Sequence, residues 1–324
     1  MPDLRIGLVG ASRVASFAII AAAREIEGVE VVAVAARDPA RARAYAEEHG
    51  LGKVHADYAS LYADPGIDLV YIGTPPSLHA GQAMAAIEAG KAVLVEKPFA
   101  LSSKEARRVA ARAAERNIPV FEAMHSPHHH LFGRVTDLID AGTLGSLRHI
   151  DAVFDAPIDQ EDPIRWRAEF GGGALMDLGV YPLALVRRLA GEDFAVRSVT
   201  AVMRSGVDES FAAELVYANG VTARIASTMK PLKPALTLRI EGDDGVLTIR
   251  NPYVPQIGHL LTLETRGQVT TETVEGPGSY AAQLAVVRRT LVEAEPFPYP
   301  ADDFVRSMEA IEAIRAHMPR DGAA

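Results

Sequence analysis

Continuous apolar runs alternate with longer alanine-rich or amphipathic segments over the first 121 residues of the chain. The runs predict strands and the segments between them predict helices, because strands buried on both faces of a sheet read as unbroken apolar stretches. The predicted strands cover residues 5–10, 29–35, 67–73, 92–95 and 120–121. The predicted helices cover residues 11–27, 39–49, 78–89 and 102–116. This alternation indicates βαβ units and a parallel sheet.

The pattern changes in the second half of the chain, where polarity alternates residue by residue. A helix over 132–141, a strand over 147–154 and a helix ending near 189 are followed by predicted strands at 196–203, 209–217, 221–227, 237–241, 245–249 and 260–265. Such alternation is typical of a mostly antiparallel sheet with one face toward solvent or a partner. Two helices, over 279–294 and 302–318, end the pattern, and the last is expected to pack back on the first half.

The turn after the first strand has the position of a dinucleotide-binding turn. That motif places glycine where the chain turns tightly, where the pyrophosphate approaches and where helix packs on strand. Gly10 fits the first place, Ser12 occupies the second with a small hydroxyl side chain, and Ala15 is tolerated in the third. The predicted phosphate-binding residues are Gly10, Ala11, Ser12, Arg13 and Val14, with a tight turn that binds no ligand as the alternative.

The end of the second strand bears on the choice of nicotinamide cofactor. NAD binding places an acid there for the ribose hydroxyls, whereas NADP binding needs a cation for the 2′-phosphate. Arg37 follows the strand and Arg41 lies nearby, while Asp38 has the position of a helix N-cap. The residues favour NADP(H) over NAD(H), with an exposed arginine at a helix start as the alternative.

Lys97 lies at the end of the strand over 92–95, within Glu96-Lys97-Pro98. Ligands of an open parallel sheet bind outside the carboxyl ends of its strands, and Pro98 stiffens the turn that aims the lysine. Lys97 is therefore a candidate for chemistry, with a solvated loop lysine as the alternative.

Two later stretches carry further candidates. Three glycines, 171–173, lead into a helix on which Asp177 and Tyr181 are four residues apart and share a face. The alternative is a flexible loop followed by a helix whose tyrosine packs in the core. A histidine cluster over 125–130 suggests a metal, but consecutive side chains do not converge on one ion, and we expect no metal site. Substrate contacts are expected from His125, Arg165 and Trp166.

Composition narrows the classes of protein. The 324 residues are 48% hydrophobic and 23% charged, which suits two globular domains, expected at 1–123 and 124–324. A net charge of −9 argues against a nucleic-acid partner. The absence of cysteine excludes disulfides and thiolate nucleophiles. No apolar run reaches the roughly 20 residues that span a bilayer, and Met1–Arg5 lead directly into a strand, so we expect a cytoplasmic enzyme.

These motifs together resemble the glucose–fructose oxidoreductase / inositol dehydrogenase / rhizopine-catabolism (Gfo/Idh/MocA) family. The resemblance rests on the Gly10 turn, Gly73-Thr74-Pro75 with His79, Glu96-Lys97-Pro98, and the stretch 171–179. It spans nearly the whole chain and implies an α/β fold: a Rossmann domain followed by an α+β domain with a large open, mostly antiparallel sheet that often mediates oligomers. It also implies that Thr74, Pro75, His79 and Glu96 line the cofactor site.

The resemblance further implies that Lys97, Asp177 and the residue at position 181 surround the reacting carbon. Many relatives have histidine at that last position and an acid three residues later, where this chain has Tyr181 and Ala184. With tyrosine at position 181 the chain resembles the branch of the family that contains dihydrodiol and xylose dehydrogenases. The absence of an acid at position 184 argues against an inositol-type substrate. An ammonium group beside a tyrosine favours the phenolate, so Tyr181 is expected to carry the proton. Lys97 would orient the substrate oxygen or shuttle the proton itself, and Asp177 would balance its charge.

The sequence therefore predicts an NADP(H)-dependent oxidoreductase that transfers hydride between nicotinamide and a sugar, ketosugar or cyclic diol. The alternative is a non-catalytic regulator that uses the same fold to bind dinucleotide or sugar. A homo-oligomer, dimer or tetramer, is expected through the C-terminal sheet.

Overall fold

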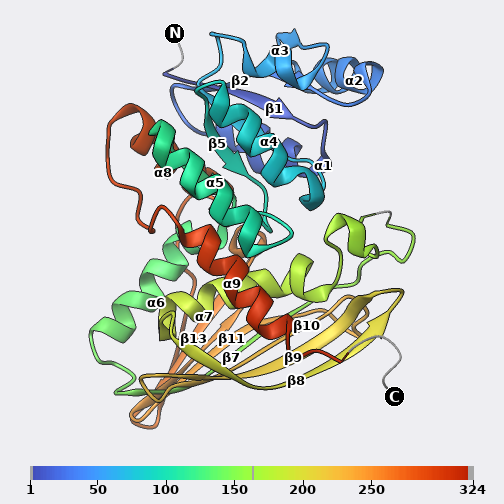
Figure 1. The fold of residues 1–324 in the computed structure, drawn as a ribbon. Helices are drawn as coiled ribbons and strands as arrows, with labels where there is room; N and C mark the ends of the chain where they lie inside the picture. The colour runs from blue at the N-terminus through green and yellow to red at the C-terminus, as the bar shows by residue number, and fades with distance from the viewer. Residues whose placement is uncertain (1–2, 163, 320–324) are drawn as a thin grey trace. The chain divides into compact units, whose positions relative to one another are not determined.

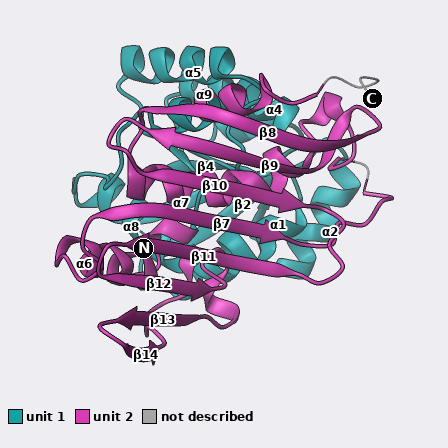
Figure 2. Cartoon of the chain, turned by 90° about the horizontal axis from the view of Figure 1, so that it is seen from below, with its two compact units in different colours: residues 1–125, 280–308 teal, residues 126–279, 309–324 magenta. Residues whose placement is uncertain are grey.

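The computed structural model describes residues 3–162 and 164–319, and the outermost residues of the two expected domains lie outside these ranges. The chain forms two compact units (Figure 2). Unit 1 contains residues 1–125 and 280–308, and unit 2 contains 126–279 and 309–324. None of the helices in the described ranges has both the length and the hydropathy needed to cross a bilayer.

Unit 1 is built on a six-stranded sheet in the order β3-β2-β1-β4-β5-β6, and all its neighbouring strands run parallel (Figure 1). The strands are β1 Leu4–Val9, β2 Val29–Ala35, β3 Lys53–Val54, β4 Leu69–Ile72, β5 Ala92–Val95 and β6 Val120–Glu122. The order reverses at β1, which places a topological switch point between β1 and β4. The Rossmann-type sheet expected from the apolar runs is confirmed.

The helices of unit 1 follow the alternation in the sequence. They are α1 Arg13–Ala15 with the π-helix η1 Ser16–Ala21, α2 Pro39–His49, α3 Tyr58–Tyr62, α4 Pro76–Glu88, α5 Ser103–Arg116 and α8 Ser279–Val292. Asp38 caps α2, accepting from Ala40 N at 2.8 Å as predicted. The sequence pattern did not predict β3 or α3, because two residues and one and a half turns are too short to show a period.

The expected domain boundary differs from the observed one. The sequence pattern placed residues 124–324 in the second domain and expected the last helix to pack back on the first, whereas unit 1 ends at residue 125 and regains 280–308. Ala281, Leu284 and Val287 of α8 are buried in the core of unit 1, and this apolar face explains the return of the chain. The helix α9, Asp303–Arg315, begins in unit 1, where Phe304 stacks on Phe99 with ring centroids 3.9 Å apart.

Unit 2 contains an eight-stranded sheet in the order β14-β13-β12-β11-β7-β10-β9-β8. The strands are β7 Leu147–Asp155, β8 Phe194–Arg204, β9 Val207–Tyr217, β10 Thr222–Thr228, β11 Ala235–Gly242, β12 Gly245–Arg250, β13 Leu260–Thr265 and β14 Gln268–Glu272. All pairs are antiparallel except β7 with β10, so the expected mostly antiparallel sheet is confirmed. The edge strand β14 did not show in the sequence because its residues are largely exposed.

One face of this sheet is covered and the other is open. The π-helix η4, Leu175–Gly179, and the helix α7, Val180–Ala190, pack on β7 and β10, while α6, His130–Asp140, belongs to the same unit. Figure 2 looks onto the opposite face, where no helix of the described chain lies in front of the central strands. The covered face holds the core of unit 2, and the open face carries polar and charged residues.

Candidate active site

The turn between β1 and α1 is shaped by close contact with the turn after β4. Gly10 has φ +98°, and a side chain there would place its Cβ 3.1 Å from the carbonyl oxygen of Gly73. A Cβ at Gly73 would in turn meet Ser12 Oγ at 2.6 Å. The two turns at the switch point therefore need both glycines. The hydroxyl of Ser12 caps α1, because Ala15 N donates to it at 3.3 Å.

Two side chains of α2 hold this turn from behind. Arg41 Nη2 donates to the carbonyl oxygen of Ala11 at 2.8 Å, and the hydroxyl of Tyr45 donates to the carbonyl oxygen of Ser12 at 3.0 Å. Arg41 and Tyr45 are four apart and so share one helix face. Burial raises the pKa of Tyr45 to about 12, so this hydroxyl remains a donor at neutral pH. Arg13 and Arg37 are exposed beside the turn.

The turn after β4 is linked to the turn after β5 through His79. Its ring nitrogens lie 2.7 Å from the carbonyl oxygen of Thr74 and 2.9 Å from that of Pro98. Burial lowers the pKa of His79 to about 4, against the opposing effect of the two carbonyls. The hydroxyl of Thr74 is buried and has no hydrogen-bond partner within the described ranges. His79 therefore supports both turns, while the hydroxyl of Thr74 takes no part in holding them.

Glu96 precedes Lys97 and anchors it in the sheet. The hydroxyl of Tyr71 on β4 donates to Glu96 Oε1 at 2.7 Å, and Lys97 N lies 3.2 Å from Glu96 Oε2. Tyr71 is fully buried, and burial beside Glu96 raises its pKa well above the usual range. The peptide bond between Lys97 and Pro98 is cis. Lys97 is half-buried at the carboxyl end of β5, as the sequence predicted.

The predicted helix of unit 2 begins differently from the expectation. Residues 175–179 form a π-helix rather than an α-helix, and α7 follows it. Asp177 lies in the π-helical part with its side chain 13% exposed, and Arg165 Nε lies 2.9 Å from its carboxylate. Arg165 also lies 3.4 Å from Asp162. Single π-helical turns are rare and often accompany functional sites.

Tyr181 lies at the start of α7 against aromatic side chains of the sheet unit. Its ring makes an edge contact with Phe154, with centroids 5.3 Å apart, and Phe154 stacks on Tyr253 at 4.9 Å. Tyr253 is fully buried, while Tyr181 is half-buried. The aromatic packing fixes the ring of Tyr181 and keeps part of it accessible.

The three expected substrate contacts have different environments. His125 is 1% exposed and stacks on Tyr280, with ring centroids 3.9 Å apart. Trp166 is buried, and its indole nitrogen donates to the carbonyl oxygen of Asp159 at 2.7 Å. Arg165 is exposed and pairs with Asp177. Their contacts with substrate stay predictions, of which Arg165 has the most accessible side chain.

The histidine cluster is used structurally. His129 Nδ1 accepts from Leu131 N at 3.0 Å at the start of α6, and burial lowers the pKa of His129 to about 4. His259 receives a hydrogen bond from Val274 N at 2.9 Å. Within the described ranges no group of three or more His, Asp and Glu side chains could hold a metal ion.

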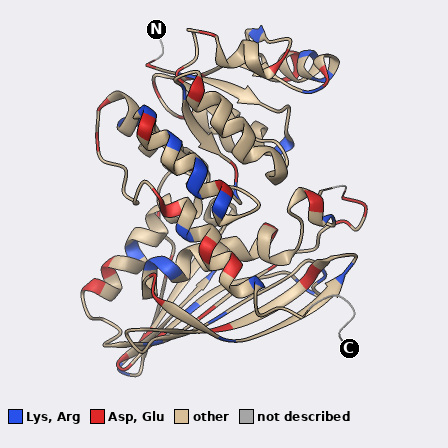
Figure 3. Cartoon of the chain, in the orientation of Figure 1, with Lys and Arg blue, Asp and Glu red and all other residues tan. Residues whose placement is uncertain are grey.

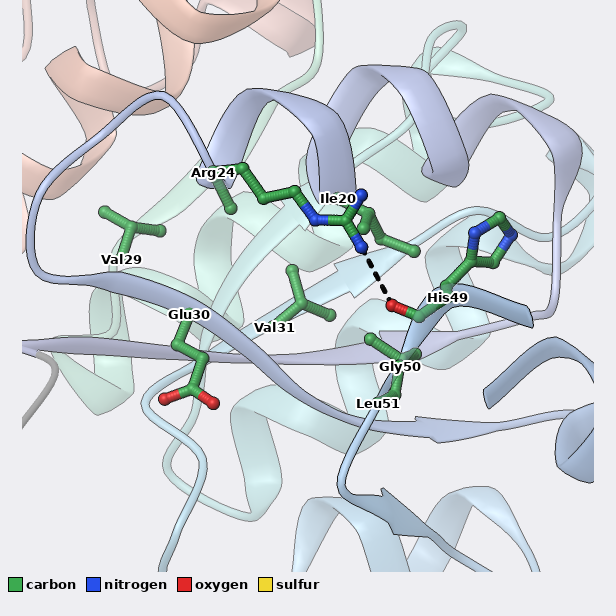
Figure 4. Close-up of a pocket in the computed structure, with 9 residues that line it drawn as sticks. Ile20, Arg24, Val29, Glu30, Val31, His49, Gly50 and Leu51 are labelled. Carbon is green, nitrogen blue, oxygen red and sulfur yellow. Dashed lines mark hydrogen bonds between the residues drawn. The ribbon is translucent and has the colours of Figure 1, made fainter. Parts of the chain in front are cut away.

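A shallow cavity of about 150 Å³ in unit 1 lies away from these residues (Figure 4). Its lining comes from the end of the first helical segment, the start of β2 and the end of α2: Ile20, Ala23, Arg24, Val29, Glu30, Val31, His49, Gly50 and Leu51. The cofactor turn follows the carboxyl end of β1, which runs parallel to β2. The cavity therefore lies at the opposite, amino-terminal edge of the sheet.

The structure thus assembles two groups of predicted residues. Unit 1 brings together the Gly10 turn, Arg41, Thr74, His79, Glu96 and Lys97. Unit 2 brings Asp177 next to Arg165 and places Tyr181 one turn further on. The convergence of Lys97 with Asp177 and Tyr181 stays a prediction. Sequence reasoning missed Tyr45 and Tyr71, although the spacing of Arg41 and Tyr45 on one helix face was available as a signal.

Comparison with known proteins agrees with these features. Residues 4–124 match the model of the oxidoreductase family with an NAD-binding Rossmann fold, GFO_IDH_MocA, and residues 132–248 match the GFO/IDH/MocA C-terminal domain. A dTDP-3,4-didehydro-2,6-dideoxy-α-D-glucose 3-reductase from Streptomyces violaceoruber is 36% identical over 87% of this chain and 83% of its own. An NADP⁺-dependent D-xylose 1-dehydrogenase from Haloferax volcanii is 31% identical over 96% of both chains.

A solved structure has the same architecture. The crystal structure of a 3-ketoreductase from Actinomadura kijaniata in complex with NADP and TDP-benzene superposes with a TM-score of 0.91 and 26% identity, covering 98% of both chains. Together, the two domain models, the switch-point turns and the Glu-Lys-Pro motif place this chain in the Gfo/Idh/MocA family of oxidoreductases.

Proposed function

We propose that this protein is an NADP(H)-dependent oxidoreductase that moves hydride between nicotinamide and a carbinol or carbonyl carbon of a sugar, ketosugar or cyclic diol. The observation that carries the proposal is the presence of both Lys97, at the carboxyl end of β5, and a half-buried Tyr181 at the start of α7. A non-catalytic regulator would have no need of both proton-transfer groups.

The residues of unit 1 fit a dinucleotide. The turn at Gly10 exposes backbone ahead of α1, where N–H groups attract phosphate. The unpartnered hydroxyl of Thr74 lies on the neighbouring turn, and Arg37 supplies an exposed cation after β2. When bound, NADP(H) supplies or accepts the hydride. Arg41 is already hydrogen-bonded to Ala11, so we assign the 2′-phosphate contact mainly to Arg37.

Tyr181 is proposed to give or take the proton at the substrate oxygen, and Lys97 to orient that oxygen and favour the phenolate. Variants of the Actinomadura kijaniata reductase, with a tyrosine replaced by phenylalanine and a lysine by alanine or glutamate, have been crystallised with NADP and TDP-benzene. Those two positions are separated by the same number of residues as Lys97 and Tyr181. This spacing supports the assignment.

Asp177 is proposed to balance charge beside the reacting groups. In the structure its carboxylate pairs with Arg165 at 2.9 Å, so Arg165 shares that task. Arg165 is exposed, and we propose that it exchanges its partner from Asp177 to an anionic group of the substrate. A nucleotide-linked ketosugar, the substrate type of the reductases named above, would present such a group, whereas D-xylose would not.

The direct test measures absorbance of reduced nicotinamide with both cofactors against a panel of substrates. The panel contains D-xylose, D-glucose, trans-1,2-dihydrobenzene-1,2-diol and a dTDP-linked 3-ketosugar. We expect turnover with NADP(H) and at least one substrate, with Lys97→Met and Tyr181→Phe lowering kcat by 10²-fold or more, on the order expected for loss of general acid–base catalysis. Tight NADPH binding without turnover on any substrate would favour the regulator.

Cofactor choice has its own test. Arg37→Ala should weaken NADP(H) binding by about tenfold or more while NAD(H) binding changes little, because only NADP carries the 2′-phosphate. Arg43→Ala is the matched control, since Arg43, on the nearby helix α2, is also an exposed arginine. Equal losses for the two cofactors in Arg37→Ala would contradict the assignment.

The open face of the eight-stranded sheet is proposed to form a homo-oligomer, a dimer or tetramer. Its strands carry both signs of charge (Figure 3), with Arg224 lying 3.2 Å from Asp151 and 3.9 Å from Glu214. Mixed charge on one face is compatible with a self-complementary interface. The molar mass from analytical ultracentrifugation should be that of a dimer or a larger oligomer, and Arg224→Glu should lower it toward the mass of the monomer. A monomeric wild type would refute the proposed oligomer. The cytoplasmic location stays a prediction.

A further inference from the structure

The helical segment that carries Asp177 and Tyr181 begins at a buried carboxylate from another strand. Asp208, near the start of β9, is 5% exposed, and its Oδ2 accepts a hydrogen bond from Leu175 N at 2.6 Å. The first N–H groups of a helix have no partner within the helix. Asp208 satisfies one of them at the first residue of the π-helix.

The second carboxylate oxygen of Asp208 faces Gly173. That glycine has φ +111°, and a Cβ added to it would come 2.2 Å from Asp208 Oδ1. The carbonyl oxygen of Gly173 in turn accepts from Asp177 N at 2.9 Å. The carboxylate therefore sets both the first residue of the segment and the backbone that supports Asp177.

A second contact from β9 holds the segment on the far side of Asp177. A Cβ at Gly179, two residues before Tyr181, would meet the ring of Phe211 at 2.6 Å. Both ends of the π-helix thus lie so close to β9 that only glycine fits. The start of Tyr181's helix is defined by contact with one strand.

A β-bulge makes the double contact geometrically allowed. Asp208 and Phe211 are three residues apart, so on a regular strand they would face opposite sides of the sheet. Val202 pairs with Ser210 and Met203 pairs with Asp208, which leaves Glu209 as an extra residue in β9. The extra residue shifts the alternation by one, and both side chains reach the covered face.

We propose that Asp208 is a positioning residue for the reaction: by binding Leu175 N it fixes where the segment begins, and so fixes the hydroxyl of Tyr181 relative to substrate. The proposal rests on the function proposed above. Asp208 is buried and acts only through the backbone of the segment, and misplacing a reacting group by about 1 Å can reduce a rate 10²-fold.

The experiment compares Asp208→Ala and Asp208→Asn by steady-state kinetics with the best substrate of the panel and by fluorescence titration with NADPH. Asp208→Ala should lower kcat about 10- to 100-fold and leave NADPH affinity within about twofold, because the cofactor residues belong to unit 1. Asp208→Asn should recover most of kcat, since its amide oxygen can still accept from Leu175. Glu209→Gln, the exchange at the bulge residue, is the control and should leave kcat unchanged.

A double variant separates positioning from general instability. If Asp208 acts through Tyr181, Asp208→Ala should lower kcat by a smaller factor in a Tyr181→Phe background than in wild type, because the hydroxyl it places is gone and only its effect on Asp177 is left. Multiplicative losses, or an Asp208→Ala kcat within twofold of wild type, would overturn the proposal. Should the alanine variant not fold, Asp208→Glu moves the carboxylate by one methylene, and an undiminished kcat there would overturn it equally.

Amide hydrogen exchange, which does not depend on activity, distinguishes a wrong role for Asp208 from a wrong proposed function. Amide hydrogen exchange at Leu175 should be faster in Asp208→Ala than in wild type. An unchanged exchange rate would refute the role of Asp208 in holding the backbone of Leu175. If Tyr181→Phe leaves kcat unaltered while Asp208→Ala accelerates amide exchange at Leu175, the proposed role of Tyr181 in the chemistry is wrong. The role of Asp208 in holding Leu175 would still stand.

Discussion

The turn after β1 in unit 1 and the Tyr181 segment in unit 2 are each fixed by side chains from a distant element. The contacting residues are separated by similar distances along the chain. Arg41 lies 30 residues from Ala11 and Tyr45 lies 33 residues from Ser12, while Asp208 lies 33 residues from Leu175. The chemistry is opposite. In unit 1 two donors bind backbone carbonyls, whereas in unit 2 one carboxylate accepts from a backbone N–H.

The two regions differ in how many hydrogen bonds hold the backbone and in how much room surrounds them. Loss of Arg41 or Tyr45 leaves the other contact, and Arg41 is exposed, so water can replace it. Asp208 is buried and packed against a glycine that has no room for a side chain, and the other contact from β9, Phe211 at Gly179, is apolar and cannot replace its hydrogen bond. The segment that carries Tyr181 is therefore the less tolerant of substitution.

The largest expected effect is the loss of folding stability caused by a substitution at Gly173. Gly173→Ala adds a Cβ against Asp208 at φ +111°, and we expect the free energy of unfolding to fall by about 2–4 kcal/mol. Gly220→Ala is the matched control, because φ is +88° but nothing lies within 4 Å; it should cost about 1 kcal/mol. Urea denaturation measures both. Equal losses would show that backbone strain, and not Asp208, determines the cost.

The next effect is a dependence on pH. Burial raises the pKa of Asp208 to about 6, and the hydrogen bonds from the backbone N–H groups of Leu175 and of Asp208 itself, with the charge of Arg315, oppose the shift. An acid whose pKa is raised in the folded state binds protons more tightly there, so wild type gains stability as pH falls from about 6 toward the unfolded-state pKa of about 4. Asp208→Asn lacks this gain.

The stability of Asp208→Asn relative to wild type should therefore fall by about 2 kcal/mol between pH 8 and pH 4. Denaturant titrations at four pH values measure the difference, with Glu209→Gln as control. In unit 1 the pKa of Tyr45 is about 12, so its contact with Ser12 should show no such dependence. A pH-independent difference for Asp208→Asn would break this contrast.

A smaller effect is expected at the support of Lys97. Tyr71→Phe removes the donor to Glu96 Oε1 inside the core, which should cost about 1–2 kcal/mol of unfolding free energy. Tyr58→Phe on α3, outside the site, should cost less than 0.5 kcal/mol on the order expected for a surface change. Similar losses in both variants would show that the Tyr71–Glu96 bond contributes no more than a surface hydroxyl.

The smallest expected effect tests redundancy at the turn. Tyr45→Phe removes one hydrogen bond to Ser12 and should weaken NADPH binding about three- to tenfold, roughly 1 kcal/mol. Arg41 still binds Ala11 in this variant, so binding is reduced and not lost. A 10²-fold loss would mean that Tyr45 holds the turn alone.

The sequence predicted the parts of the site that depend on local pattern. Strand ends, the cap at Asp38 and the Gly10 turn follow from periodicity and residue type, so the sheet of unit 1 and the place of Lys97 were predictable. The π-helix over 175–179 and the role of Asp208 were not. Alternation along β9 predicts that Asp208 and Phe211 point in opposite directions, and only the pairing register shows the extra residue at Glu209.

The return of α8 to unit 1 has a consequence for how the protein is made. Chains emerge from the ribosome from the N-terminus, and domains generally fold as units during synthesis. The strands of unit 2 are complete at Glu272, before α8 begins at Ser279. Unit 1 therefore completes its core only after the sheet strands of unit 2 have been synthesised, and its nascent sheet must wait for Ala281, Leu284 and Val287.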